Sequence, residues 1–275
     1  GRISFSVDGK GFDVRISTLP VLYGEKVVMR LLDRSMSIRG LNELDFVRHN
    51  AETFMDLIHR PLGLVLVTGP TGSGKTTTLY AALNALRSPT VNLVTCEDPV
   101  EIDLPGVNQS SVNERVGLTF ARQLRAILRQ DPDIVLVGEM RDSETAEIAF
   151  RAAMTGHLVL STLHSNDAPT SVTRLLDMGV PPFLIASGLI GMVAQRLVRR
   201  LCASCRQQGP VSEVNARLLS VNPTDRFWYA GSGCSACEGT GFKGRIGVHE
   251  VVGVDENMQR LIMDRAPSSV LRRSS

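Results

Sequence analysis

A glycine-rich segment at residues 69–76 has the residue types and the spacing needed to hold phosphate. It follows the pattern G-x-x-x-x-G-K-T. A short apolar run at 64–67 precedes it, as expected of a buried parallel strand, and an Ala/Leu-rich run at 76–86 without glycine or proline predicts a helix. In this context the loop N–H groups and the positive end of the helix dipole close around phosphate oxygens. The residues expected to contact the nucleotide are Gly69, Pro70, Thr71, Gly72, Ser73, Gly74, Lys75, Thr76 and Thr77.

Two residues of this loop have specific expected tasks. Lys75 is expected to reach the β- and γ-phosphates, and the hydroxyl of Thr76 is expected to ligate Mg²⁺. The sequence therefore predicts a site for ATP or GTP with magnesium.

Carboxylates and a histidine follow other apolar runs, where they could serve hydrolysis. The acidic segment 97–101 comes directly after the run 91–95, and Glu139 follows the run 134–137 through Gly138, where many phosphate-loop enzymes have an aspartate. Such carboxylates orient an attacking water or contact Mg²⁺. His164, after the run 158–163, is a candidate sensor of the γ-phosphate. A solvated acidic loop and a structural histidine are the alternatives.

Four cysteines form the second group with chemical potential: Cys202, Cys205, Cys234 and Cys237. Two C-x-x-C pairs are typical of a closed tetrahedral zinc site, which has a structural role because four thiolates leave no open position. The long interval between the pairs predicts a small helical insertion at 211–219. Disulfides are the alternative, and the cytosolic setting implied by a nucleotide site argues against them.

The first part of the chain alternates apolar and polar residues with a period of two. Residues 2–32 predict three strands with a turn at 8–11, as at the end of a small antiparallel α+β domain of PAS-like type covering 1–33. Polar residues 34–43 are expected to form a linker. An arginine from a neighbouring domain can stabilise a transferring phosphoryl group. The candidates are Arg2, Arg15 and Arg30.

From residue 44 the pattern changes to alternating strands and helices. Strands are expected near 63–68, 91–95, 133–138 and 157–163, and helices near 50–59, 75–87, 119–130, 142–154 and 168–178. The alternation predicts an α/β core with a mainly parallel sheet over 44–275, into which the cysteine module at 199–245 is inserted. Ligands of such sheets bind outside the carboxyl ends of the strands, which is where the phosphate loop falls.

Composition argues against some classes of protein. The 275 residues carry a net charge of +2 and only 5% aromatic residues, which argues against backbone tracking and base stacking on nucleic acid. The apolar stretch 180–194 contains prolines and glycines and is too short to span a bilayer. The chain does not begin with methionine, so we expect it to be a fragment with further sequence upstream.

Four segments together resemble the secretion ATPase superfamily, a group of hexameric RecA-like motors. They are 69–76, 97–101, 138–142 and 155–164, which are similar to its Walker A, Asp box, Walker B and His box. The four cysteines and the run 244–250 most resemble type II secretion ATPases, with type IV pilus assembly ATPases as the alternative. The resemblance implies catalytic roles for Glu97, Glu139 and His164, and arginines of the preceding domain that reach the nucleotide.

The resemblance also implies a biological setting. It implies Mg²⁺-dependent ATP hydrolysis that rotates one domain against the next and drives pseudopilus assembly at the cytoplasmic side of the inner membrane. A homohexamer would dock on inner-membrane platform proteins through a region upstream of this sequence. Two other classes stay open: a nucleic-acid translocase or binding protein, and a scaffold that binds nucleotide without hydrolysis.

Overall fold

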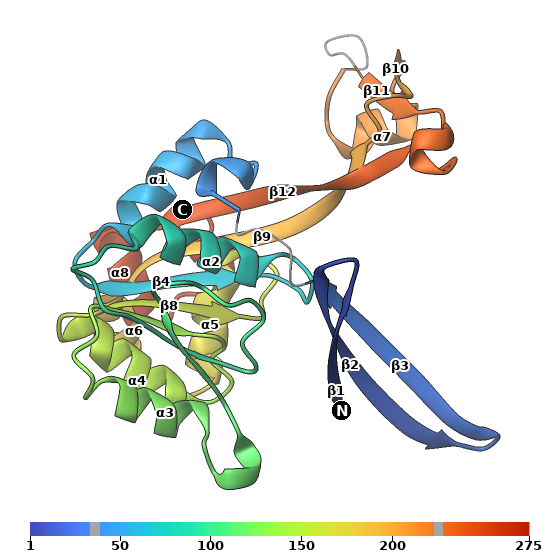
Figure 1. The fold of residues 1–275 in the computed structure, drawn as a ribbon. Coiled ribbons are helices and arrows are strands. Elements are labelled where there is room, and N and C mark those ends of the chain that lie inside the picture. The colour runs from blue at the N-terminus through green and yellow to red at the C-terminus, as the bar shows by residue number, and fades with distance from the viewer. Residues whose placement is uncertain (34–38, 223–227, 275) are drawn as a thin grey trace.

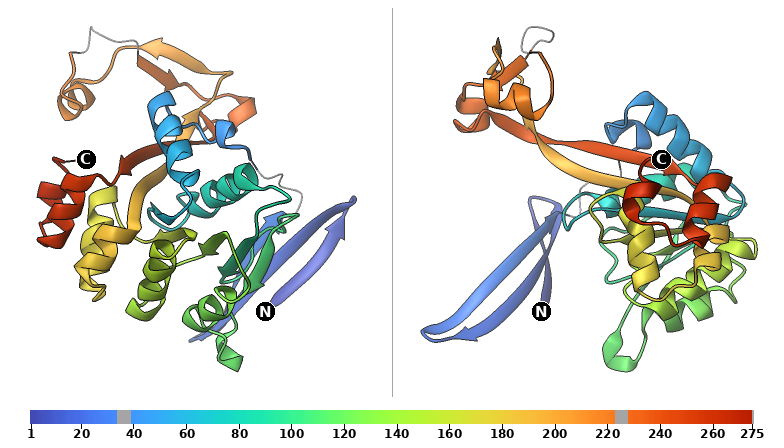
Figure 2. Two further views of the ribbon diagram at one scale, coloured as in Figure 1. Left: turned by 90° about the vertical axis from the view of Figure 1, so that its left-hand side faces the viewer. Right: turned by 180° about the vertical axis from the view of Figure 1, so that it is seen from behind.

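The computed structural model describes residues 1–33, 39–222 and 228–274. The chain forms a three-stranded sheet at the N-terminus, an α/β core, and a cysteine module at the end of an arm of two long strands (Figure 1). In the right-hand view of Figure 2 the N-terminal sheet and the cysteine module both extend away from the core.

The N-terminal sheet is antiparallel, with the order β1-β2-β3. Its strands are β1 (Arg2–Val7), β2 (Lys10–Val21) and β3 (Gly24–Asp33). Residues 1–33 form strands and turns, so the described part of the predicted α+β domain is its sheet. Of the predicted linker, residues 34–38 lie outside the described residues, and η1 (Leu41–Glu43) is a short 3-10 helix.

The core sheet has seven strands in the order β12-β9-β4-β8-β7-β5-β6. Every neighbouring pair is parallel except β12 and β9, which confirms a mainly parallel sheet. The strands are β4 (Gly63–Thr68), β5 (Leu93–Glu97), β6 (Asn108–Ser111), β7 (Ile134–Val137), β8 (Leu158–Leu163), β9 (Leu189–Leu201) and β12 (Phe242–Gly253). The expected strand 91–95 lies two residues further along, so Glu97 ends β5.

Helices cover both faces of this sheet, because alternate strand residues are apolar toward each face. One face packs against α1 (Arg48–Ile58) and α2 (Lys75–Leu86). The other packs against α3 (Phe120–Ile127), α4 (Ser143–Met154), α5 (Ala168–Asp177), α6 (Pro182–Gly188), α8 (Glu256–Met263) and α9 (Ser268–Leu271). All five helices expected from the pattern are present, with ends shifted by a few residues.

The stretch 180–194 forms α6 and the first half of β9, neither of which the apolar pattern resolved. Strands β9 and β12 pair antiparallel and run past the sheet edge as an arm. The arm carries β10 (Arg206–Gly209), α7 (Glu213–Leu218), β11 (Trp228–Gly231) and η3 (Ser235–Cys237). Helix α7 lies within the predicted insertion 211–219. Among the described residues, no helix has the length and apolar character needed to cross a membrane.

Candidate functional site

The phosphate loop connects the carboxyl end of β4 to the first turn of α2, as the sequence predicts. Gly74 precedes the helix with φ +90°, a conformation that glycine adopts without steric cost. The Lys75 ammonium donates to the carbonyl oxygens of Gly69 at 2.8 Å and Pro70 at 3.2 Å. Burial lowers the pKa of Lys75, and the negative charge of Glu139 opposes this shift. The lysine is thus held at the loop, in the field of Glu139.

The loop has a buried side and an open side. Gly69 and Ser73 are buried, whereas Pro70, Thr71 and Gly72 are exposed at the rim. Thr76 and Thr77, in the first turn of α2, are also exposed. Their hydroxyls are therefore accessible to a ligand bound at the loop.

Glu139 is the centre of a charged cluster at the same edge of the sheet. Its carboxylate accepts from Arg141 Nε at 2.7 Å and lies 3.3 Å from Nε2 of His164. Arg141 also donates to Asp98 at 3.1 Å. The hydrogen bond to Glu139 is the main cause that raises the pKa of Arg141 above its ordinary value, so its guanidinium stays charged. Three strand ends, of β5, β7 and β8, thereby contribute to one cluster.

Gly138 explains why this strand end has no aspartate. A Cβ at this position would lie 3.2 Å from the carbonyl oxygen of Cys96 and 3.2 Å from Cα of Glu97. The N–H of Gly138 donates to the same Cys96 carbonyl at 2.8 Å. The close approach of β5 and β7 leaves little room for a side chain at Gly138, so Glu139 is the carboxylate that this strand offers.

Glu97 lies apart from the Glu139 cluster, on the face of the sheet that α2 covers. It is 3% exposed, and its carboxylate accepts from Tyr80, from Thr95 at 2.6 Å and from Gln109 at 3.2 Å. Burial first, and then the charge of Glu97, raises the pKa of the Tyr80 phenol well above its usual range. Tyr80 therefore stays protonated and donates. Glu97 anchors α2 to the end of β5 in this arrangement.

The three candidate arginines occupy one cross-strand row of the N-terminal sheet. Arg15 pairs in register with Arg2 on one side and with Arg30 on the other. Arg15 donates to Glu101 of the acidic segment at 2.8 Å, and Arg30 is exposed. The side chain of Arg2 lies outside the described residues. This row thus meets the acidic segment through Arg15.

The sequence analysis gave no role to several residues of the site. Arg141 could have been suspected from its place two residues after Glu139. Gln195 is a buried amide in an apolar strand, and it donates to the Ser73 carbonyl in the phosphate loop at 2.6 Å. Tyr80 sits in a helical run where an aromatic residue is ordinarily part of the core, so its hydrogen bond to Glu97 could be seen only in three dimensions.

The four cysteines converge although 28 residues separate the two pairs. Their sulfur atoms all lie within 4.8 Å of one another, and all four are free thiols. The Cys202–Cys234, Cys205–Cys237 and Cys234–Cys237 sulfur distances are 3.9, 3.8 and 3.8 Å. A tetrahedron with metal–sulfur bonds of about 2.3 Å has edges of about 3.8 Å. The cluster could therefore hold a metal ion.

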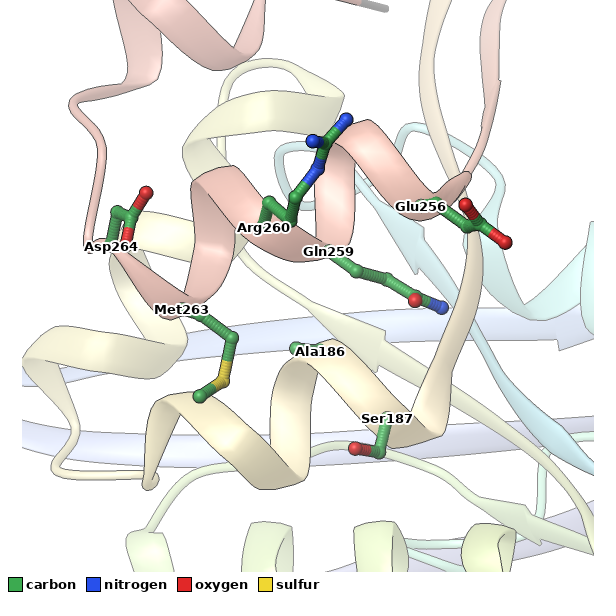
Figure 3. A pocket seen from close by; sticks show the side chains of 7 residues that line it. All are labelled: Ala186, Ser187, Glu256, Gln259, Arg260, Met263 and Asp264. Atoms are coloured by element: carbon green, nitrogen blue, oxygen red, sulfur yellow. The ribbon is translucent and has the colours of Figure 1, made fainter.

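A surface pocket lies between α6 and α8, and Figure 3 shows Gln259 and Met263 extending from α8 toward α6. Helix α6 leads directly into β9, which is parallel to β4, so this pocket lies at the amino ends of the strands. The phosphate loop lies at the carboxyl ends. The pocket is therefore separate from the site described above. Its lining residues are Ala186, Ser187, Glu256, Gln259, Arg260, Met263 and Asp264.

Comparison with solved structures supports the fold. The pilus retraction motor PilT with bound ADP aligns with the whole chain at a TM-score of 0.69 and 28% identity, over 70% of that protein. The DotB ATPase of Legionella pneumophila aligns with a TM-score of 0.68 at 20% identity, over 100% of this chain and 67% of that one, and supports the fold alone.

Comparison with curated proteins and family models supports the family. The type II secretion system ATPase E of Vibrio cholerae is 51% identical over 274 residues, which are 99% of this chain and 54% of that protein. The type II secretion system protein HxcR of Pseudomonas aeruginosa is 51% identical over 275 residues, 100% of this chain and 55% of that protein. The chain thus spans about half the length of these relatives. A family model described as type II/IV secretion system protein matches residues 1–274, and the chain belongs to this family.

Proposed function

We propose that this chain is the ATP-hydrolysing part of a type II secretion motor. The observation that carries the proposal is the cluster of Glu139, His164, Arg141 and Asp98 at the sheet edge that holds the phosphate loop. A binding loop alone would support only nucleotide binding. A carboxylate beside a cationic lysine and a histidine at the same edge supports hydrolysis.

Binding begins at Lys75. Its ammonium now donates to two loop carbonyls, and phosphate oxygens would replace these acceptors. The exposed hydroxyl of Thr76 and the carboxylate of Glu139 are oxygen ligands of the type that Mg²⁺ prefers. Magnesium, when bound, neutralises charge that develops on the phosphates.

Glu139 is the group that we assign to the attacking water. Arg141 holds one oxygen of this carboxylate and His164 lies at the other, so its orientation is fixed from two sides. His164 would respond to the γ-phosphate because its side chain is half exposed beside Glu139. The role predicted for Glu97 stays a prediction, since its carboxylate would reach a water only after releasing one of its three donors.

Arginines of the N-terminal sheet are the remaining groups that we propose for the site. Arg2, Arg15 and Arg30 would stabilise charge on the phosphoryl group after this sheet moves relative to the core. In the present arrangement Arg15 is engaged by Glu101, so the movement would have to exchange that partner for the nucleotide. This exchange would link hydrolysis to domain motion.

We assign zinc to the four cysteines, because a closed set of four thiolates suits a structural tetrahedral zinc ion. Two backbone N–H groups, of Cys234 and Gly241, point at the Cys237 sulfur at 3.2 Å, as expected around a thiolate. Metal analysis of purified protein should give about one zinc per chain, and a stoichiometry far below one would contradict the assignment.

The names of the relatives favour type II secretion over pilus assembly. On this basis we propose a homohexamer at the cytoplasmic side of the inner membrane, docked on platform proteins through a region outside this sequence. We propose the division of the chain as 1–33, linker 34–43 and ATPase domain 44–275, with the zinc module at 199–245.

The test is phosphate release by the parent protein and by Glu139→Gln. Loss of a group that activates water should lower kcat by roughly 10²- to 10⁴-fold. The affinity for ATP should stay close to that of the parent, because Glu139 does not itself contact phosphate and glutamine keeps an oxygen that can face Mg²⁺. Colorimetric phosphate release and titration with a fluorescent ATP analogue measure the two quantities.

Glu144→Gln is the matched control. Glu144 is an exposed carboxylate in the first turn of α4, and it pairs with Arg125 of α3 and not with a residue of the Glu139 cluster. This variant should hydrolyse ATP at the parental rate. Equal, near-zero rates for the parent and Glu139→Gln would favour a nucleotide-gated scaffold and contradict the proposal.

A further inference from the structure

Gln195 is a buried amide that the nucleotide motifs do not account for. It lies on β9, one residue after Ala194, which pairs with Thr68 at the end of β4. The phosphate loop begins at Gly69, the residue that follows β4, so Gln195 lies beside the start of the loop. Its side chain is 4% exposed and follows the buried Met192 and Val193. A buried amide in such a strand costs stability unless both its ends are hydrogen-bonded.

Both ends of the Gln195 amide are used. Its Nε2 donates to the Ser73 carbonyl oxygen at 2.6 Å, and its Oε1 accepts from the Thr78 hydroxyl at 2.8 Å. A carbonyl oxygen can only accept, so the NH₂ group must face Ser73, which settles the orientation of the amide. The side chain thus connects the loop to the first turn of α2.

This contact determines the direction of an N–H group in the loop. The Ser73 carbonyl and the Gly74 N–H belong to one planar trans peptide and point in opposite directions. When Gln195 holds the carbonyl oxygen toward β9, the Gly74 N–H is aimed away from β9, toward the open side of the loop. A Cβ at Gly74 would lie 2.8 Å from Nε2 of Gln195, so glycine is also what permits the contact.

We propose that Gln195 is a positioning residue that sets the phosphate loop for nucleotide before the nucleotide binds. The inference rests on the proposed function, since it concerns how the same loop holds phosphate. A loop whose N–H groups are already aimed at the ligand loses less conformational freedom on binding, and affinity rises accordingly. The loop recognises phosphate groups, so this effect depends on the polyphosphate of the ligand and not on its base.

The test compares the parent with Gln195→Met, which keeps the volume and removes both hydrogen bonds. Titration with mant-ATP and Mg²⁺ should give a Kd about tenfold higher in the variant, as expected for loss of one preset hydrogen bond. At saturating ATP, kcat should stay within about twofold, because the loop holds phosphate equally in the ground and transition states. The Kd for mant-AMP, which lacks the β- and γ-phosphates, should change much less.

Gln123→Met is the matched control. Gln123 on α3 is 3% exposed, and its Nε2 donates to the Ser111 carbonyl at 2.6 Å and to the Ser110 hydroxyl at 3.1 Å, so it is also a buried amide bound to a backbone carbonyl, but not in a phosphate loop. The Gln123→Met variant should lose stability in thermal unfolding and keep the parental Kd for mant-ATP. Thr78→Val removes only the partner of Oε1, so it should raise that Kd by roughly threefold. If Gln195→Met does not fold, the Kd of Thr78→Val for mant-ATP tests the proposal in its place.

The outcomes separate this inference from the proposed function. A parent protein that does not bind mant-ATP would overturn the proposed function. A parent that binds, together with a Gln195→Met variant that binds ATP equally tightly, would overturn the role of Gln195 alone. The role of Gln195 would also be overturned if Gln195→Met raised the Kd values for mant-AMP and mant-ATP equally. A Gln123→Met variant that raised the Kd for mant-ATP as much as Gln195→Met does would have the same meaning. Either result would indicate a general structural defect.

Discussion

Sequence motifs predict both the phosphate-loop site and the cysteine module, but different interactions hold the two regions in place. The phosphate-loop site draws on the carboxyl ends of β4, β5, β7 and β8 and on Gln195 in the middle of β9, and it rests on two large apolar clusters. The cysteine module stands at the end of the β9–β12 arm. Among the described residues, its apolar cluster consists of the cysteines themselves: Cys202, Cys205, Cys234 and Cys237.

The difference shows what holds each region together. Burial of apolar surface fixes the strand ends, so the charged groups of the site are positioned by the core beneath them. The module has too little apolar surface for that, so we infer that its order would depend on a metal ion held by the four sulfur atoms. The two regions should therefore respond to different perturbations.

Removal of the metal should have the largest effect. Metal binding supplies about 10–16 kcal/mol in small zinc domains, so chelation should unfold the module between β9 and β12. The Kd for ATP should stay within about twofold, because distant sites without shared contacts perturb each other by less than about 0.5 kcal/mol. Hydrogen exchange after chelation, with ATP titration alongside, measures both.

Cys96→Ala serves as the control, because Cys96 is buried in β5 and is not part of the cluster. It should keep the full metal content. A fall in ATP affinity on chelation that matches the loss of protection in the module would break the comparison, since it would make the two regions one cooperative unit.

In the phosphate-loop site, Glu97→Gln should cause the next largest effect, a loss of stability. The amide would turn an NH₂ group toward donors that need an acceptor, and a buried unsatisfied group costs about 1–3 kcal/mol. Glu139→Gln should cost less than about 1 kcal/mol of stability, because its cluster is partly exposed. Urea unfolding of both variants measures the difference.

One result would contradict the difference that we expect between Glu97 and Glu139. If Glu97→Gln keeps the parental stability and loses turnover as fully as Glu139→Gln does, then Glu97 acts on the nucleotide directly. The anchoring role that we assign to it would then be wrong.

The contact between the N-terminal sheet and the core should have the smallest effect. Arg15 and Glu101 form a pair whose side chains are 25% and 35% exposed, so a double-mutant cycle should give less than about 1 kcal/mol, and less still at high salt. The exposed pair Arg48–Glu52 on α1 is the control, with an expected coupling of about 0.3–0.5 kcal/mol. A coupling above about 2 kcal/mol would mean that the N-terminal sheet is locked to the core.

Much of the core could be predicted from the sequence, because its signals are local. Short apolar runs indicated β4, β7 and β8 closely, and the five expected helices are the segments that alternate with the apolar runs. The stretch 180–194 could not be resolved in the same way. An apolar run that is buried on both faces has no period, so it does not distinguish α6 from the start of β9.

In the site, too, some features could be predicted from the sequence and others could not. The motifs placed Lys75, Glu139 and His164 at strand ends, and a parallel sheet necessarily gathers its strand ends at one edge. They did not indicate that Glu97 faces α2 and binds Tyr80, or that Arg15 meets Glu101, because side-chain partners depend on which faces of two elements meet.

Residue types and short spacings were enough to predict the chemistry of this protein: a phosphate-binding loop, carboxylates after apolar strands, and four cysteines in pairs. Both properties are local to the chain. Which side chains meet depends on the folded chain, above all for the contact of Gln195 with the phosphate loop across 122 residues of sequence. Contacts of that range arise from the packing of β9 against β4, which no local pattern encodes.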